Sequence, residues 1–335
     1  MTSPDTVIER RGSAMEAPSF SRHFHYGAQD FVCMGRFTYI YKTRCANNTV
    51  AIRVVNYNGD TYEEAVRQCT RNFDNLKQFQ HPNLIMYHDI RVSSTPIGAK
   101  IEFMTDYCPG LDLGRRIATL RNDAVILNAV TVLTYVEQIA SGLSFLHERN
   151  FMHGVLSPAT ILIKRLNNAE DRLLIGSLEN ISPVSPTLED EEQELYYDKF
   201  HWDYTSPELT NYIRTPDFST YKQNVRNEGA HGLKSDIWSL GCVFLRLANC
   251  ITGQHEKALC KAGRKVVIDA TVETDRYISL LLSGYSHYIS ETIPDAIRYC
   301  IQDCLHRKVQ RRMTAMQLLS RLNTVITEIR ELELP

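Results

Sequence analysis

Apolar and polar residues alternate through the first third of the chain, and this part of the pattern predicts strands. Three runs rich in β-branched and aromatic residues lie between Phe31 and Val55: FVCMG, FTYIYKTR and VAIRVV, the last two separated by an Ala-Asn-Asn turn. Apolar residues at helical spacing then predict a helix over 61–79, and two further strands are expected near 84–91 and 100–105. This order predicts a small lobe built mainly of β-sheet.

Helical periodicity dominates beyond Cys108-Pro109-Gly110, a sequence typical of a hinge. Amphipathic or strongly apolar stretches predict four long helices, at 131–148, 235–249, 294–305 and 314–332. Two polar stretches interrupt this half of the chain, an acidic run over 188–194 and a loop over 210–233 that contains Lys, Asn and Gly. They are expected to lie at the surface.

The pattern as a whole predicts an α+β fold with two lobes. The expected parts are a flexible tail over 1–25, a lobe with a small antiparallel sheet and one helix over 26–108, and a larger, mainly helical lobe over 109–332. A chain of 335 residues is long enough for such a bilobal unit.

Composition narrows the classes of function. With 43% hydrophobic and 23% charged residues, the chain has the balance of an ordinary globular protein. Its formal net charge of −2 gives no electrostatic reason to expect nucleic acid or an anionic membrane as a partner, and no apolar run approaches the length of a membrane span. The polar N-terminus lacks an apolar signal core, and the nine cysteines lack paired spacing, so we expect reduced thiols in the cytoplasm.

Eight short motifs follow one another in a characteristic order. They are Cys33-Met-Gly-Arg-Phe-Thr, Val50-Ala-Ile-Arg, His81-Pro-Asn, Asp106-Tyr-Cys, His153-Gly-Val-Leu-Ser-Pro-Ala-Thr, Gly176-Ser-Leu-Glu, Ser206-Pro-Glu and Lys234-Ser-Asp-Ile-Trp-Ser-Leu-Gly. This order resembles a eukaryotic protein kinase domain over about 27–330, and the fourth and eighth motifs are most similar to the NIMA-related (Nek) Ser/Thr kinases. The resemblance implies a bilobal protein-kinase-like fold.

Five positions that the kinase family uses for catalysis carry other side chains here. Val155 stands at the catalytic Asp and Thr160 at the Asn that holds magnesium, while Ser157 replaces the catalytic-loop Lys. Ser177 stands at the Asp that binds magnesium, and Asn72 at the helix Glu. Valine can neither accept a proton nor orient a hydroxyl group, so no catalytic residue and no metal ligand are expected.

The resemblance also implies a candidate nucleotide pocket. Its members are Gly35, Ile40, Ala51, Arg53, Thr105 and Leu162. Gly35 alone remains of three glycines, so this stretch is either a phosphate cover or an ordinary strand turn. Arg53 stands where the family has Lys, and it is either a nucleotide contact or a solvated strand residue.

Two ways of replacing the lost carboxylates stay open. Glu63 or Glu64 would have to compensate for Asn72 from more than a turn earlier on the helix. Glu179, at the Gly of the family's Asp-Phe-Gly element, would offer a carboxylate to magnesium only with a different backbone course.

Positions that serve folding in the family are filled, by contrast. The resemblance implies an internal spine of His153, Leu178, Leu76 and Tyr87, a buried pair of Glu208 with Arg312, and Asp236 as a backbone-binding anchor under the catalytic loop.

These observations favour a pseudokinase, a catalytically impaired Nek-like protein that binds or scaffolds other proteins in kinase signalling. The alternatives are a Nek-type Ser/Thr kinase with residual activity by an altered mechanism, and a sensor that binds ATP without magnesium. We expect an unidentified protein partner, with no nucleic acid and no membrane, and family resemblance adds association with the cytoskeleton as an option. A partner would meet 188–194 or 210–233, unless those segments are simply solvated.

Overall fold

The computed structural model of the chain describes most of the residues from Phe24 to Leu332. The described ranges are 24–34, 38–45, 48–58, 62–166, 170–184, 204–208, 231–252 and 294–332. Two compact units make up the chain: the N-terminal unit contains 1–109 with 178–180, and the C-terminal unit contains 110–177 with 181–335. Each unit has its own core.

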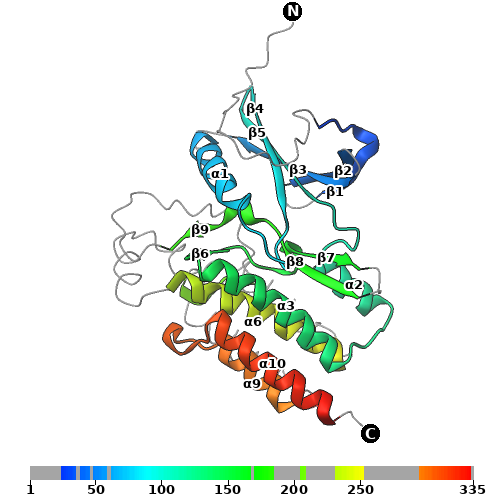
Figure 1. The fold of residues 1–335 in the computed structure, drawn as a ribbon, viewed down its shortest axis with the longest axis vertical. Coiled ribbons are helices and arrows are strands. Elements are labelled where there is room, and N and C mark those ends of the chain that lie inside the picture. Colours follow the sequence, from blue (N-terminus) through cyan, green and yellow to red (C-terminus); the bar gives the residue numbers. More distant parts are fainter. Residues whose placement is uncertain are drawn as a thin grey trace, which may run out of the picture. The chain divides into compact units, whose positions relative to one another are not determined.

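A five-stranded antiparallel sheet in the order β1-β2-β3-β5-β4 forms the N-terminal unit, together with helix α1 (Figure 1). The elements are β1 (Phe31–Met34), β2 (Thr38–Cys45), β3 (Asn48–Asn58), α1 (Tyr62–Leu76), β4 (Tyr87–Thr95) and β5 (Gly98–Asp106). The three strands predicted before residue 56 and the helix are confirmed. The fourth strand starts later than predicted, because a turn in which the Leu84 N–H donates to the His81 carbonyl precedes it.

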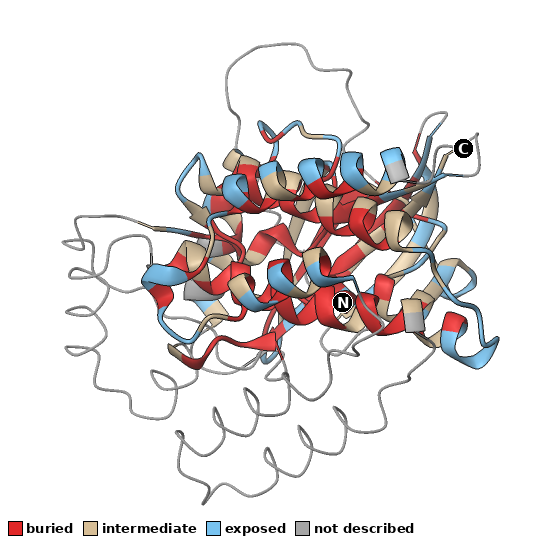
Figure 2. Ribbon diagram, turned by 90° about the horizontal axis from the view of Figure 1, so that it is seen from below, coloured by how far each residue is buried: buried red, intermediate tan, exposed pale blue. Residues whose placement is uncertain are grey.

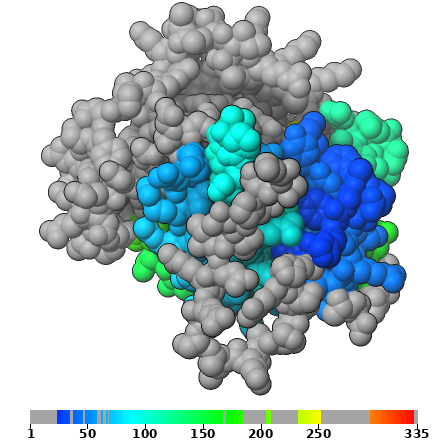
Figure 3. Space-filling model, turned by 90° about the horizontal axis from the view of Figure 1, so that it is seen from above, coloured from blue at the N-terminus to red at the C-terminus, as the bar shows by residue number. Residues whose placement is uncertain are grey.

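Side chains alternate between the two faces of this sheet, as the period of a β-strand requires. On β3, the buried Val50, Ile52 and Val54 share one face, and Ala51 and Arg53 share the other. Figure 3 views the molecule from the side of this unit, where the surface of the first strands is blue and that of β4 and β5 is cyan. One face of β3 is therefore apolar, and the other carries the charge of Arg53.

Among the described residues, helices and two two-stranded ladders, β6-β9 and β7-β8, form the C-terminal unit (Figure 1). Its helices are α2 (Leu113–Asn122), α3 (Ala129–His147), α6 (His231–Thr252), α9 (Asp295–Cys304) and α10 (Ala315–Leu332), and its strands are β6 (Phe151–Met152), β7 (Ile161–Arg165), β8 (Asp171–Ile175) and β9 (Ser182–Pro183). The four predicted long helices are confirmed as α3, α6, α9 and α10. The pattern did not indicate α2, which begins where the Asp112 carboxylate accepts from the Arg115 N–H (2.9 Å).

The core of this unit lies where α3 packs against α6 and α10, and buried positions line the facing sides of these helices (Figure 2). By length and composition alone α3 could cross a membrane, contrary to the expectation that no run approaches a span. However, 56% of that stretch is buried inside the unit. Burial against neighbouring helices is what a core helix requires, so the apolar length of α3 is explained by packing.

The irregular segments differ in part from the prediction. Phe24 and His25 were expected in the flexible tail, but Phe24 is buried because its ring packs on the sheet. Residues 231–233, expected in a loop, begin α6. The acidic run 188–194 and the stretch 210–230 lie outside the described residues, as do 1–23 of the tail.

Most of the described cysteines are buried thiols. All eight that the structure describes are free thiols, and every one of them except Cys33 is buried. Burial raises the pKa of Cys300, which keeps this thiol protonated and unreactive.

Candidate functional site

An ion pair links Arg53 on β3 to Glu179 in the short 3-10 helix Leu178–Asn180. Nη2 of Arg53 lies 2.9 Å from Oε1 of Glu179, and Nη1 lies 3.4 Å from Oε2, so the guanidinium meets the carboxylate with both of its ends. The Glu179 side chain is 1% exposed and that of Arg53 is 19% exposed. Both residues belong to the N-terminal unit.

Two more residues of the N-terminal unit hold the same segment. The Tyr87 hydroxyl donates to Oε2 of Glu179 (2.6 Å) and accepts from the Leu178 N–H (3.1 Å). The side-chain amide of Asn72 on α1 donates to the Glu179 carbonyl oxygen (3.1 Å). Glu179 is therefore fixed both by its carboxylate and by its backbone.

The electrostatics of this cluster favour the ionised pair. Burial, the largest single effect, would lower the pKa of Arg53, but the charge of Glu179 together with the neighbouring Tyr87, Tyr57 and Cys69 raises that pKa above its ordinary value. Burial, and then the charge of Glu179, also raise the pKa of Tyr87 well above its ordinary value, so this hydroxyl remains a hydrogen-bond donor. A buried carboxylate needs such partners, because removing one member of a buried pair costs about 3–5 kcal/mol.

This geometry excludes one of the two alternatives for Arg53. The interpretation as a solvated strand residue is wrong, because the guanidinium is paired and mostly covered. Glu179 supplies the carboxylate that pairs with Arg53 in place of one at position 72, whereas Glu63 is exposed. Sequence reasoning missed this role of Glu179. Two signals were available in the sequence. Glu179 is acidic where the resemblance implies Gly, and Asn72 is neutral where it implies Glu.

Hydrogen bonds within the catalytic loop occupy the hydroxyl of Thr160. It accepts from the Ser157 N–H (3.0 Å) and donates to the Ser157 carbonyl (3.0 Å), which caps the short 3-10 helix Pro158–Thr160. Val155 lies between His153 and this helix, and its N–H donates to Nδ1 of His153 (3.4 Å). Ser157 itself is buried. Hydroxyl and backbone groups of the loop thus bond to one another, and no residue from Gly154 to Thr160 carries a carboxylate.

Asp236 on α6 anchors this loop from below, as the sequence predicted. Its carboxylate accepts from the backbone N–H groups of His153 (2.7 Å) and Gly154 (2.9 Å), and Nε2 of His147 lies 3.0 Å away. The Asp236 side chain is buried, and three partners satisfy it. The anchoring role is confirmed.

The predicted pair of Glu208 with Arg312 is also confirmed. Nη2 of Arg312 donates to Oε2 of Glu208 (2.7 Å), and Nη1 donates to Oε1. The Arg312 Nε–H donates to the His306 carbonyl (2.7 Å), and the Arg312 side chain is fully buried. This bidentate geometry is the one that a guanidinium forms best.

The candidate nucleotide residues fall into two groups. Ile40 faces Arg53 across the β2–β3 ladder, and Ala51 faces Thr105 across the β3–β5 ladder, so these four lie together on neighbouring strands. Leu162 lies on β7 in the C-terminal unit, where it bridges to Asp112. Gly35 lies outside the described residues.

The donor set does not fit magnesium. Serine stands at position 177 and threonine at 160, and neutral hydroxyls are poor ligands for a cation that prefers carboxylates. The nearest substitute in the sequence, Glu179, already pairs with Arg53. Among the residues that the structure describes, no three His, Cys, Asp or Glu side chains gather into a cluster able to hold a metal ion.

Comparison with known proteins identifies the family that this fold and these positions define. The family described as protein kinase domain matches residues 29–322, which is most of the chain. The chain belongs to the protein kinase domain family.

Its similarity to individual kinases is modest. It is 24% identical over 96% of its length to MAP kinase kinase kinase wis4 of Schizosaccharomyces pombe, and 34% identical over 40% of its length to serine/threonine-protein kinase ULK3 of Xenopus laevis. It is 25% identical over 69% of its length to CBL-interacting protein kinase 5 of Oryza sativa subsp. japonica. These matches cover 22%, 26% and 44% of the respective relatives, so the chain spans less than half of each.

Proposed function

We propose that this chain is a pseudokinase, a member of the protein kinase family that binds other proteins in kinase signalling instead of transferring phosphate. The ion pair between Arg53 and Glu179 carries this proposal. In the family, the cation at position 53 pairs with the nucleotide phosphates and with a helix Glu. Here both Nη groups of the guanidinium contact the Glu179 carboxylate, at 2.9 and 3.4 Å, so the donors that would hold a phosphoryl group are directed at a buried side chain instead.

The catalytic loop supports the same proposal. A positioned general base contributes about 10²–10⁴ in rate, and Val155 stands where the family has that base. Because phosphoryl transfer depends almost wholly on positioning and charge neutralisation, the joint loss of base, metal ligands and free cation leaves little to drive the reaction. The proposed activity is therefore binding.

The finer parts of the proposal rest on sequence motifs. Asp106-Tyr-Cys-Pro-Gly-Leu-Asp-Leu and Lys234-Ser-Asp-Ile-Trp-Ser-Leu-Gly-Cys support a place near the Nek kinases. We further propose a protein partner, a cytoplasmic location and, if any nucleotide binds, ATP without magnesium. The apolar Ile40 and Ala51 suit an adenine ring, while the paired Arg53 offers little to a triphosphate.

Two measurements on the purified chain test the proposal. Incubation with ATP labelled at the γ-phosphate, magnesium and a general protein substrate is expected to give no transfer above that of an Arg53→Ala variant. A thermal-shift titration with ATP at up to millimolar concentration is expected to show no dependence on magnesium. Transfer that disappears in Arg53→Ala, when circular dichroism shows that variant to be folded, would establish residual kinase activity and refute the proposal.

A further inference from the structure

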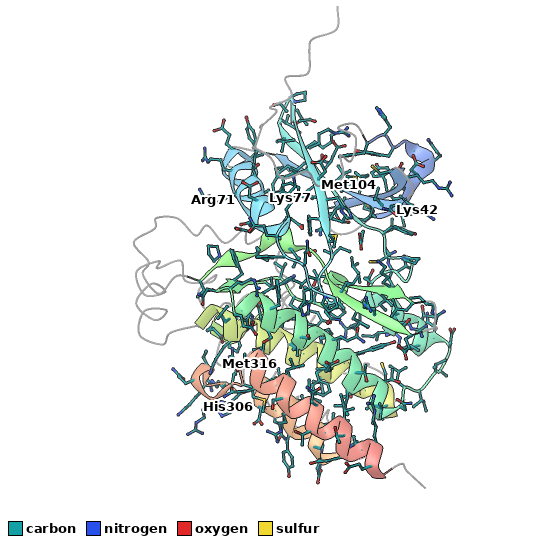
Figure 4. All side chains as sticks on the ribbon, viewed as in Figure 1. Lys42, Arg71, Lys77, Met104, His306 and Met316 are labelled. Atoms are coloured by element: carbon teal, nitrogen blue, oxygen red, sulfur yellow. The ribbon has the colours of Figure 1, made fainter. Side chains whose placement is uncertain are left out.

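The N-terminal segment Phe24–Tyr26 covers one face of the five-stranded sheet. Phe24 is buried in an apolar cluster on that face, and Tyr26 packs against its edge. The other members of the cluster are Cys45, Val50, Ile52, Val54 and Met104, with Tyr41 packed beside Tyr26. Met104 is labelled on β5 in Figure 4. The segment itself forms neither a helix nor a strand, so side chains account for much of its hold on the sheet.

A buried charge lies at the centre of this face. The side chain of Glu102 on β5 is 0% exposed, and it receives hydrogen bonds from the Tyr26 hydroxyl and from Nε of Arg91. Nζ of Lys100 lies 3.3 Å from it. Burial would raise the pKa of Glu102, but the hydrogen bonds from Arg91 and Tyr26 outweigh burial and hold that pKa below its ordinary value. The carboxylate is therefore charged, and one of its donors, the Tyr26 hydroxyl, belongs to the segment that covers it.

Arg91 ties the segment to the same charge. Its guanidinium lies 4.4 Å from the centre of the Phe24 ring, and Nη1 donates to the Phe24 carbonyl (3.3 Å). The Thr43 hydroxyl donates to the His25 carbonyl (2.9 Å). The sheet thus recognises two aromatic side chains and two backbone carbonyls, whereas the side chain of His25 is exposed.

This arrangement has the components of a peptide-binding site. It combines an apolar pocket for a Phe, a buried carboxylate that accepts from a Tyr hydroxyl, and two donors aimed at backbone carbonyls. Aromatic anchors fixed by a few polar contacts are the usual basis of specific recognition. The requirement is for Phe and Tyr separated by one residue whose side chain points to solvent.

We propose that this face of the sheet is a docking surface for a Phe-x-Tyr segment, which Phe24–Tyr26 occupies in the free chain. A partner protein that carries such a segment binds there when the chain's own segment leaves. Because the chain's own segment is tethered, it competes at a high effective concentration and keeps the surface closed to weak ligands. The surface lies wholly within the N-terminal unit, so the proposal does not depend on whether the chain transfers phosphate.

The test uses the full-length chain and a fluorescent peptide with the sequence of residues 20–29. The full-length double variant Phe24→Ala/Tyr26→Ala is expected to bind this peptide at least about tenfold more tightly than the unaltered chain, because it no longer competes with itself. A peptide with Phe instead of Tyr at position 26 should bind about tenfold more weakly, since the buried carboxylate loses a donor. A peptide with Ala at both aromatic positions should not bind.

The controls separate docking from general loosening of the fold. His25→Ala changes an exposed side chain between the two anchors and should leave peptide binding as in the unaltered chain. A folded double variant that fails to bind the peptide, or binds the Ala peptide equally well, would overturn the proposal. If the double variant does not fold, Tyr26→Phe takes its place: tighter peptide binding than in the unaltered chain supports the docking surface, and equal binding refutes it.

Discussion

The side-chain amide nitrogen of Asn72 lies 3.1 Å from the backbone carbonyl oxygen of Glu179. Helix α1 therefore contacts the Leu178–Asn180 segment through a neutral donor, at the position where the resemblance to kinases implies a carboxylate. The negative charge that pairs with Arg53 comes from Glu179 and not from α1. Arg53 is therefore paired with a carboxylate of the Leu178–Asn180 segment.

Restoring the family residue at position 72 should accordingly destabilise the protein. Asn72→Glu replaces a buried donor with an acceptor that faces a carbonyl, and it adds a second carboxylate near Arg53. We expect a loss of more than about 2 kcal/mol in the free energy of unfolding, measured by urea denaturation. Asn72→Gln, which has the same size but keeps a donor, should cost clearly less, and Glu179→Gln should partly rescue Asn72→Glu. Equal losses for Glu and Gln would contradict this account.

The pair itself can be measured with a double-mutant cycle. Arg53→Met and Glu179→Gln each leave one buried partner uncompensated, so each should cost about 3–5 kcal/mol. The loss of unfolding free energy in the double variant should be smaller than the sum of the two single losses by about 1 kcal/mol or more, because the partners interact directly. Arg44→Met on the neighbouring strand is the control, since this exposed arginine should change stability by less than about 0.5 kcal/mol. Strict additivity of the two losses would argue against the pair.

Much of the scaffold could be predicted from the sequence because local signals carry it. The alternation from Val50 to Val54 fixes the faces of β3, and motifs that resemble those of kinases indicated the contacts of Asp236 and Arg312. Burial and backbone hydrogen bonds determine which residues can stand at these positions, and periodicity and motif order predict both well.

The partners of the altered residues could not be predicted in the same way. The contact of Arg53 with Glu179 joins positions that are 126 residues apart, and the contact of Tyr26 with Glu102 joins positions 76 apart. Neither contact produces a period or matches a motif. Phe24 likewise belongs to a stretch without periodicity, so only the tertiary structure shows that its ring is buried. Local patterns predict helices and strands, whereas the partners of Arg53 and Tyr26 are known only from the tertiary structure.

The fully buried guanidinium of Arg312 should not tolerate lysine. Arg312 donates to Glu208 and, from Nε, to the His306 carbonyl (2.7 Å), and an ammonium group cannot span both directions. Arg312→Lys should cost about 3–5 kcal/mol in the free energy of unfolding, measured by chemical denaturation. Arg311→Lys, at the exposed neighbouring position, is the matched control and should be near neutral. A tolerated Arg312→Lys would show that charge alone suffices at this position.

Glu137 on α3 gives the protein a pH dependence with a defined sign. Burial raises the pKa of this carboxyl above its ordinary value of 4.5. The folded state then binds the proton more tightly than the unfolded state, so ionisation weakens the fold as pH rises from the unfolded pKa through the folded one. Glu137→Gln should raise the melting temperature at about pH 7, and the gain should vanish below about pH 4. Glu328→Gln, which removes a carboxylate from the exposed side of α10, is the control and should leave the melting temperature nearly unchanged.

At position 154, the backbone conformation selects glycine, and the space for a side chain does not. Its φ is +77°, a conformation that L-residues other than Asn and Asp rarely adopt, whereas a Cβ built there would meet no atom closer than Cε of Met152 at 3.6 Å. The bond from its N–H to Asp236 (2.9 Å) holds the backbone in this conformation. Gly154→Ala should therefore cost about 1–2 kcal/mol in the free energy of unfolding, and Gly154→Asn, although larger, should cost less, because Asn tolerates the left-handed region. The reverse order of the two variants would show that side-chain space, and not φ, selects glycine at this position.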